Sequence, residues 1–421
     1  MTRAVITGFG AVTNLGVDAR STWEGMREGR SGISLIDSPM FGRYKDDWSV
    51  RIAGQVRGWE PTGVIDPKEA RRLDRFAQLG LAASDEAVRH SGIDLARGNP
   101  EHHGVVIGSG IGGIQTIEDG LHTMSDRGPS RLSPFTVPRL MVNAAAGNVS
   151  IRYNLQGPAA AHATACASSG HAIGDAVGYI RRGLADVMLA GGAEAAISPL
   201  CIAAFMTMRA LSSRNDDPAR ASRPFDRDRD GFVLAEGAAM FVIESEAHAR
   251  ARGATIYAEL VGFGNSSDAS HITAPDAEGH GARRSMRLAL RDAGLEPGQI
   301  GYVNAHGTST PLGDKAEVAA VAAIFGPHAS QSAGGRLMMS STKSMHGHCL
   351  GASGAVEMLA CIHAVRDGVI APTINLQHPD DGFDIDFVAG SARERPVAYA
   401  MNNTFGFGGH NVTLIVGRYK G

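Results

Sequence analysis

The chain has 421 residues, of which 43% are hydrophobic and 20% are charged, as is usual for a globular protein. Its length is enough for two domains or for one large duplicated domain. A net charge of −3 does not indicate a nucleic-acid binder, and the four widely spaced cysteines argue against a disulfide scaffold or a zinc ribbon. We see no signal peptide and no uninterrupted membrane span, so we expect a protein of the reducing cytoplasm.

Apolar runs and helical patterns alternate along the chain. The sequence Val5-Ile-Thr-Gly-Phe-Gly predicts a first strand, and further apolar runs predict strands at residues 105–108, 187–191, 301–305 and 338–341. Apolar strands flanked by helices imply a sheet that is covered on both faces. A new strand series begins at residues 257–263, after a charged helical segment. We therefore place a boundary near Arg252, between two loosely similar halves, residues 1–252 and 253–421.

A glycine motif follows the strand predicted at residues 105–108. Residues 108–113 match the G-x-G-x-x-G pattern of dinucleotide-binding loops, but residues 129–135, where we would expect the acidic residue of such a site, contain none. We therefore do not predict a nucleotide cofactor for this loop.

Cys166 lies at a predicted junction between a strand and a helix. Mostly small residues precede it after the turn signal Gly157-Pro158, and a helical pattern with one apolar face follows it as far as Gly183. Unpaired N–H groups and the positive end of the helix dipole favour a thiolate, which is the nucleophilic form of cysteine. The alternative is a small buried hydrophobe, the usual state of a free cysteine.

A histidine motif, Asn304-Ala-His-Gly-Thr-Ser-Thr, continues from the strand predicted next. Asp314 and Glu317 have the spacing of a capping box, so we expect a helix to begin there. His306 then lies where a strand leaves the sheet, which is where open α/β folds bind ligands. The alternative is a structural histidine whose ring forms hydrogen bonds with the loop backbone.

The following strand leads into a turn that contains Lys343, His346, His348 and Cys349 and precedes a helix predicted at residues 355–365. A charged group near an imidazole suits a neutral histidine that donates a hydrogen bond to a developing oxyanion. His346, His348 and Cys349 also suggest metal ligands. No complementary ligand cluster accompanies them, so we predict no metal site.

The last motif, residues 402–411, is rich in glycine. Glycines let backbone N–H groups approach a substrate closely. A tight hairpin that leads into a last strand at residues 412–416 explains the same pattern, and the two interpretations are compatible.

Together these motifs resemble the β-ketoacyl-acyl-carrier-protein synthases, the condensing enzymes of fatty-acid synthesis, and most closely their type II, long-chain elongating members. The resemblance runs from Val5 to Gly409. It implies a thiolase-like α/β fold, with two similar halves stacked in α-β-α-β-α layers, and usually a homodimer. It also implies that the enzyme binds no cofactor, because the substrates are carried on the phosphopantetheine of acyl-carrier protein.

Carried over residue by residue, the resemblance implies that Cys166 is the nucleophile that accepts the acyl chain. His306 and His348 match the two catalytic histidines, which donate hydrogen bonds to the enolate formed when malonyl-carrier protein loses CO2. Lys343 matches the lysine of the second histidine motif, and Glu357 matches its acidic partner.

The resemblance also assigns supporting roles. The amides of Cys166 and Phe407 correspond to an oxyanion hole, and the Phe407 side chain to a gate for the acyl chain. We expect Asp314 and Glu317 to support the site. Substrate-binding positions are Ile111 for the acyl chain, Thr308 and Thr310 for the phosphopantetheine arm, and Phe405. The carrier-docking patch consists of Lys68, Arg71, Arg72 and Arg209, for which an ordinary solvated charged face is the alternative.

Three positions depart from the family pattern. His346 stands where threonine is common, from which we expect an altered loop contact; a histidine that competes with His348 is the alternative. Thr136 stands where a bulky aromatic is common near the chain-end pocket, so the accepted chain length stays open. His410 replaces a common threonine, and we interpret it as structural.

Three related classes compete with this interpretation. A polyketide-type ketosynthase would use the same triad on polyketide intermediates, but the stretch from Asn304 to Asp314 favours the fatty-acid branch. A non-catalytic partner subunit, such as a chain-length factor, typically lacks the nucleophile that Cys166 supplies here. Thiolases use two cysteines in other motifs, and Cys349 and Cys361 do not reproduce that pattern.

Overall fold

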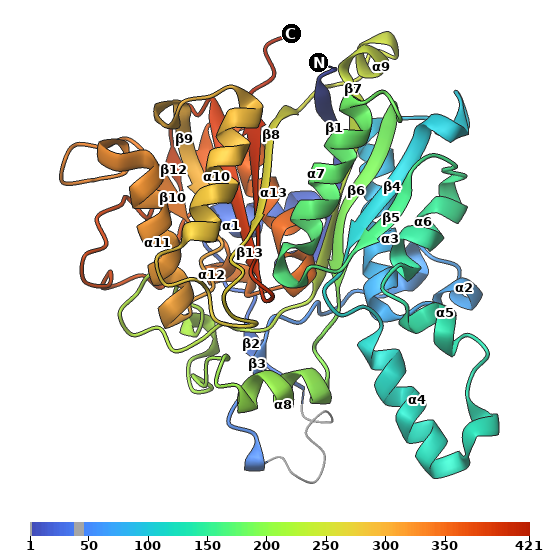
Figure 1. Cartoon of the computed structure of the whole chain (residues 1–421). Coiled ribbons are helices and arrows are strands. Elements are labelled where there is room, and N and C mark those ends of the chain that lie inside the picture. The colour runs from blue at the N-terminus through green and yellow to red at the C-terminus, as the bar shows by residue number, and fades with distance from the viewer. Residues whose placement is uncertain (1, 38–45) are drawn as a thin grey trace.

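The computed structural model describes residues 2–37 and 46–421 (Figure 1). Within these residues the main sheet has ten strands, in the order β10-β9-β13-β14-β8-β1-β7-β6-β4-β5. The first half of the chain supplies β1 (Ala4–Thr13), β4 (His103–Gly108), β5 (Ala159–His162), β6 (Val187–Glu194) and β7 (Gly237–Ser245). The second half supplies β8 (Ala258–Ser267), β9 (Ile300–Asn304), β10 (Met338–Ser340), β13 (Tyr399–Gly406) and β14 (His410–Gly417).

The two halves repeat one strand topology. In the first half β5, β4 and β6 are parallel neighbours, and β7 and β1 continue the sheet antiparallel. In the second half β10, β9 and β13 are parallel, and β14 and β8 follow antiparallel. A short antiparallel pairing of β1 with β8 joins the halves. This repeat is the thiolase-like architecture that the sequence predicted.

Helices cover the sheet in layers. The central layer holds α7 (Ser168–Arg181) and α13 (Ser353–Asp367), which pack between the two halves of the sheet (Figure 1). The outer layers hold α3 (Arg75–Ser91) and α6 (Ala144–Tyr153) on one side, and α10 (His280–Ala293) and α11 (Pro311–Phe325) on the other. Helix α13 is buried over its first 13 residues, which are small or apolar except for Glu357 and His363.

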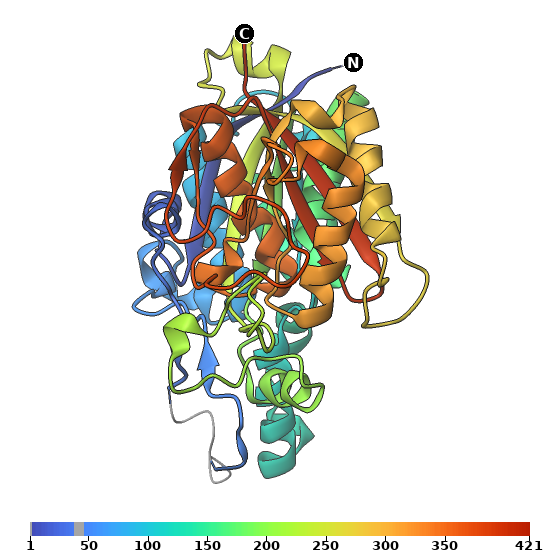
Figure 2. The same cartoon turned by 90° about the vertical axis from the view of Figure 1, so that its left-hand side faces the viewer.

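Shorter elements surround this core. Helices α4 (Ile114–Arg127), α5 (Thr136–Leu140) and α8 (Pro199–Thr207) lie below it in both views (Figure 2). The remaining elements are α1 (Ala19–Glu28), β2 (Ser34–Leu35), β3 (Ile52–Ala53), α2 (Pro67–Ala70), α9 (Glu246–Ala251), α12 (Lys343–His346), β11 (Val369–Ile370) and β12 (Arg393–Glu394). In the part of the chain that the structure describes, none of the helices is both long and apolar enough to cross a membrane.

One predicted helix start is wrong. Helix α11 begins at Pro311, with Thr310 as its N-cap, and not at Asp314. Proline suits the first helical turn because its missing N–H is not needed there. The carboxylates of Asp314 and Glu317 do not cap the helix, because both accept hydrogen bonds from the loop that precedes it.

The repeated topology brings the catalytic candidates together. Strands β5 and β10 hold the same place in their halves, and each leads, through a turn, into a central helix. Cys166 lies in the turn before α7, and His348 lies in the turn before α13. Because α7 and α13 share one layer, these turns meet although the two residues are 182 positions apart in the sequence.

Candidate active site

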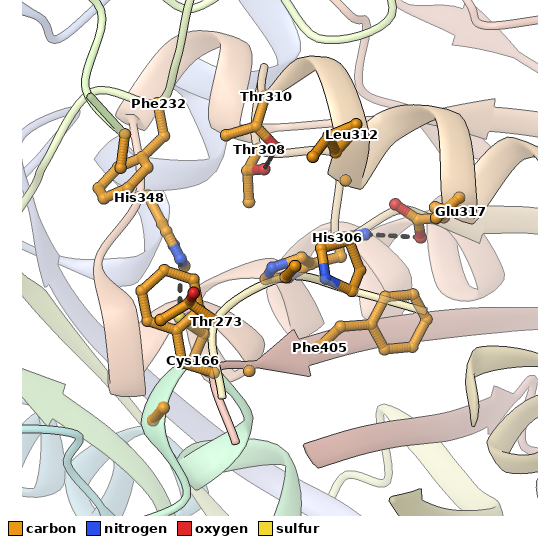
Figure 3. Close-up of a pocket in the computed structure, with 18 of the residues that line it drawn as sticks. Cys166, Phe232, Thr273, His306, Thr308, Thr310, Leu312, Glu317, His348 and Phe405 are labelled. Atoms are coloured by element: carbon orange, nitrogen blue, oxygen red, sulfur yellow. Dashed lines mark hydrogen bonds between the residues drawn. The ribbon is translucent and has the colours of Figure 1, made fainter. Parts of the chain in front are cut away.

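One cavity of about 600 Å³ contains most of the predicted site residues (Figure 3). The first half of the chain contributes Ile111, Cys166 and Arg209 to its walls. The second half contributes His306, Thr308, Thr310, Glu317, His348, Phe405 and Phe407. The cavity is therefore built by both halves, and neither half forms it alone.

Cys166 lies in the single turn of 3-10 helix just before α7. Ala165 has a positive φ of 49°, which bends the chain sharply and turns the thiol into the cavity. The Ser168 hydroxyl holds this bend by accepting a hydrogen bond from the Thr164 amide (2.9 Å) and donating one to the Ala165 carbonyl (2.6 Å). The sequence thus placed Cys166 correctly at a helix start.

The predicted preference of Cys166 for the thiolate does not hold in this structure. Burial raises the pKa of the thiol to about 12, because a charged sulfur would lose its hydration. The Lys343 ammonium and the amides of Phe407 and Cys166 act in the opposite direction and lower this pKa. The helix start alone therefore does not produce a thiolate, and the sulfur depends on its neighbours for activation.

His348 is the side chain that contacts the thiol. Its Nε2 lies 3.0 Å from Cys166 Sγ (Figure 3). Its Nδ1 lies 2.8 Å from the hydroxyl oxygen of Ser353. The His348 amide donates to the Val233 carbonyl at 2.7 Å, which fixes the backbone beneath the ring. Burial and then the Lys343 charge lower the pKa of His348 well below its ordinary value. The ring is therefore neutral at physiological pH.

His306 faces the same space from the end of β9. Its ring stands edge-on to that of His348, with centroids 5.4 Å apart. The loop is held by Glu317, whose carboxylate accepts hydrogen bonds from the amides of His306 (2.9 Å) and Gly307 (2.7 Å). Burial and then the Lys343 charge lower the pKa of His306 well below its ordinary value. The cavity thus contains two neutral imidazoles.

Lys343 forms a buried ion pair with Glu357. The lysine opens α12, the glutamate lies on α13, and their side chains are almost fully inaccessible. Burial raises the pKa of Glu357 to about 7, and the lysine opposes that rise. The ammonium group also lowers the pKa values of His306 and His348, which keeps both rings neutral.

Asp314 and Glu317 support the loop that carries His306. Asp314 accepts from the amides of Phe225 (2.8 Å) and Ser309 (3.2 Å). Burial raises the pKa of Asp314 to about 6 and that of Glu317 to about 7. Their contribution is structural support through backbone hydrogen bonds.

The substrate-binding candidates line the cavity. The hydroxyls of Thr308 and Thr310 lie 3.0 Å apart on one wall, and the ring of Phe405 lies beside His306 (Figure 3). Ile111 also lines the cavity and packs against the apolar cluster that contains Cys166. Thr136, which opens α5, is not among the residues that line this cavity.

Glu194 was missed by the sequence analysis. Its buried carboxylate accepts hydrogen bonds from the amides of Gly110 (2.7 Å), Ile111 (3.3 Å) and Gly351 (3.0 Å). Amides of the glycine motif at residues 108–113 thus bind a side chain of the protein itself. A signal that could have found Glu194 is an acidic residue at the end of an otherwise apolar strand.

The three side chains that suggested metal ligands each contact a different partner. His348 faces Cys166, His346 Nε2 lies 3.0 Å from the Thr342 hydroxyl, and the Cys349 thiol faces the Glu236 carbonyl. Among the residues that the structure describes, no group of three potential ligands gathers in a metal-binding arrangement. The side-chain amide Nδ2 of Asn14 donates to the His346 carbonyl at 3.1 Å, so this segment contacts the loop near residue 14.

The predicted docking residues are all exposed. Lys68 lies on α2, and Arg71 and Arg72 come directly after the end of this helix. The Arg72 guanidinium lies 4.9 Å from the ring of Phe135. Arg209 follows α8 and lines the cavity.

Comparison with known proteins agrees with this site. The family models for the β-ketoacyl synthase N-terminal and C-terminal domains match residues 1–249 and 257–377. The chain is 45% identical over 419 residues to 3-oxoacyl-[acyl-carrier-protein] synthase 2 of Synechocystis sp., a match that covers 99% of this chain and 98% of that protein. The chain therefore belongs to the β-ketoacyl synthase family, as its motifs predicted, and it is an enzyme of the acyltransferase class.

Solved structures show the same fold over 100% of both chains. A β-ketoacyl synthase from Burkholderia phymatum matches with a TM-score of 0.90 and 38% identity. A second match, with a TM-score of 0.90 and 31% identity, comes from a type II PKS acyl-carrier protein in complex with its ketosynthase, which is bound to the hexaketide.

Proposed function

We propose that this enzyme elongates fatty acids by condensing malonyl-acyl-carrier protein with an acyl chain held on Cys166. The observation that carries this proposal is the meeting of one thiol with two neutral imidazoles in one cavity, with His348 Nε2 3.0 Å from the sulfur. A thioester carbonyl needs a soft nucleophile and a site for its oxyanion. An enolate needs hydrogen-bond donors on its oxygen, and neutral imidazoles supply them.

In the first half-reaction the Cys166 sulfur attacks the thioester of an acyl-carrier protein. The amides of Cys166 and Phe407, which lie beside the sulfur, hold the oxyanion. The carbon–sulfur bond to the carrier then breaks, and the thiol proton ends on the departing carrier thiol. The acyl chain remains on Cys166 and extends past Ile111.

In the second half-reaction malonyl-carrier protein binds, with Thr308 and Thr310 along its phosphopantetheine arm. Loss of CO2 leaves an enolate, whose oxygen accepts hydrogen bonds from His306 and His348. The carbanion carbon attacks the acyl group, the bond to Cys166 breaks, and the released sulfur takes up one proton. The product is a β-ketoacyl-carrier protein that is two carbons longer. All of these steps use side chains and backbone, so we propose that the enzyme needs no bound cofactor. We also propose that it works in the cytoplasm, a reducing compartment that suits its four free cysteines.

Acyl-carrier protein is the proposed partner. Lys68, Arg71, Arg72 and Arg209 are exposed cations, and Arg209 also borders the cavity. Opposite charge on an acidic carrier would steer it to this patch. The similar ketosynthase whose structure includes its carrier supports this assignment by analogy.

A second copy of the chain is also proposed as a partner. Among the residues that the structure describes, no strand pairs with the outer edge of β5, and such an edge can pair with a strand of another chain. Helix α6 packs beside β5, α5 packs on α6, and α4 packs on α5. Large exposed apolar side chains lie on or next to these three helices, namely Leu121, Met124, Phe135, Val137, Met141 and Ile151. Light scattering coupled to size-exclusion chromatography should report twice the mass of one chain.

Intact-mass spectrometry after incubation with a panel of acyl-carrier proteins tests the catalytic proposal. We expect fatty-acyl adducts on the protein and none on Cys166→Ala. Adducts from polyketide intermediates alone would favour the polyketide-type alternative, for which the hexaketide-bound neighbour is the supporting observation. If no acyl group were transferred from either panel, the proposal would be wrong.

A further inference from the structure

Ser353 contacts the catalytic candidate His348 from behind. Its hydroxyl oxygen lies 2.8 Å from His348 Nδ1, on the side of the ring opposite Cys166. Ser353 is fully buried at the first turn of α13. Among the residues that the structure describes, the Nδ1 atom is the one hydrogen-bond partner of this hydroxyl.

Because this hydroxyl has a single partner, we can infer which of the two atoms, Ser353 Oγ or His348 Nδ1, donates the hydrogen bond. A hydroxyl can donate one hydrogen bond and accept two, whereas a neutral imidazole has one donor nitrogen and one acceptor nitrogen. If Nδ1 carried the proton, it would donate to the Ser353 oxygen, and the buried hydroxyl proton would have no acceptor. An unsatisfied buried donor is costly, because it loses its hydrogen bond to water and gains none in return. If Nδ1 is unprotonated, the hydroxyl donates to it and no donor is lost.

We propose that Ser353 is a positioning residue that keeps the proton of His348 on Nε2. The inference rests on the role proposed above for His348 and deepens it. Burial keeps the ring neutral, so it carries a single proton, and the partner of the inner nitrogen decides where that proton lies. The Nε2–H group then points at Cys166 Sγ and at the space that a thioester oxygen occupies after acylation.

The two tautomers of His348 have opposite effects on the reaction. An Nε2–H group donates to the sulfur and, in the second half-reaction, to the enolate oxygen. A bare Nε2 presents a lone pair to the same oxygen and repels the developing charge. Loss of the Ser353 hydroxyl would remove the preference for the productive tautomer and the contact that orients the ring.

Kinetics of three serine variants test the proposal. Ser353→Ala should slow malonyl-carrier decarboxylation by about tenfold, less than the roughly 100- to 1000-fold loss for removal of a whole donor. Ser353→Thr retains the hydroxyl and should restore most of the rate. Ser84→Ala removes a buried helical hydroxyl that bonds to the Gly80 carbonyl in α3, far from the cavity, and should leave the rate unchanged. A wild-type rate for Ser353→Ala would overturn the inference.

A spectroscopic measurement on the unmodified protein decides the same question without relying on the folding of a variant. The ¹⁵N shifts of labelled histidine distinguish the two tautomers, and His348→Gln identifies the signals of His348. We expect a protonated Nε2 and an unprotonated Nδ1, and the reverse pattern would overturn the inference. If His348→Ala decarboxylated at the wild-type rate, the role of His348 itself would be wrong. Loss of activity in His348→Ala together with a wild-type Ser353→Ala would refute the Ser353 inference alone.

Discussion

At the residue scale, burial sets the chemistry of the site more than the local sequence does. It raises the pKa of Cys166 and lowers those of His306 and His348, and it opposes charge on all three. Lys343 is the buried cation that favours sulfur ionisation while holding both imidazoles neutral. The site is thus suited to donating hydrogen bonds to negative charge that develops on the substrate.

His306→Ala tests the donor role of the second imidazole. Removing one oxyanion donor of this kind costs roughly 3–4 kcal/mol, so decarboxylation of malonyl-carrier protein should fall by about 100- to 1000-fold. Acylation of Cys166, followed by intact mass, should be much less affected because its oxyanion is held by backbone amides. Unchanged decarboxylation would show that His306 is not a donor to the enolate.

His346→Thr tests the cost of a buried histidine. Burial, and then the Lys343 charge, lower the pKa of His346 from 6.5 to about 3. At a pH between these two pKa values, the histidine binds a proton in the unfolded chain but not in the folded protein. The free energy of unfolding therefore falls as the pH falls below 6.5. The wild type should lose about 2 kcal/mol from this group between about pH 7.5 and pH 5, and the variant should not.

Urea unfolding of both proteins at the two pH values measures this difference. His122→Gln, at an exposed position on α4, is the matched control and should follow the wild type. Equal pH dependence of His346→Thr and the wild type would contradict the prediction.

At the scale of elements, the position of Cys166 depends on how closely α7 approaches β4. Gly108 ends β4, and a Cβ atom there would lie 2.3 Å from the carbonyl carbon of Ser168. Only a residue without a side chain allows this approach. The strand-to-helix turn that presents the thiol is therefore held in place by backbone contact with the neighbouring strand.

Gly108→Ala should displace the start of α7 and cost about 1–3 kcal/mol of unfolding free energy through overpacking. Acylation of Cys166 should fall with it, because the turn before the helix moves. Gly178→Ala in the same helix is the control, since its Cβ would meet its nearest neighbour only at 4.0 Å. That variant should be neutral or slightly more stable. Equal stability of the two variants, measured by thermal unfolding, would argue against the close approach.

At the scale of the whole molecule, the halves meet so that one supplies the nucleophile and the other supplies both imidazoles. The net charge is only −3, so attraction of an acidic carrier has to come from local patches such as the exposed cations near α2 and α8. The arrangement predicts that carrier recognition and chemistry can be separated by mutation.

Arg71→Glu combined with Arg72→Glu should raise the KM for acyl-carrier protein with little change in kcat. In the wild type KM should rise with salt, because screening weakens attraction between exposed charges, and in the double variant this dependence should be smaller. Steady-state kinetics over a range of salt concentrations measures both effects. A salt-independent KM in the wild type would mean that these residues are an ordinary solvated face.

The sequence by itself determined the family and the layered fold, because short motifs at strand ends carry that information locally. It also predicted site residues, most of which the structure brings to one cavity. Only the tertiary structure decided the rest. The thiol became hard to ionise because both halves bury it. Asp314 and Glu317 support the His306 loop instead of capping the helix, because their hydrogen-bond partners lie outside the helix. Glu194 and Ser353 gained roles from contacts that form only when the chain folds, and burial and pairing of this kind leave no local pattern in a sequence.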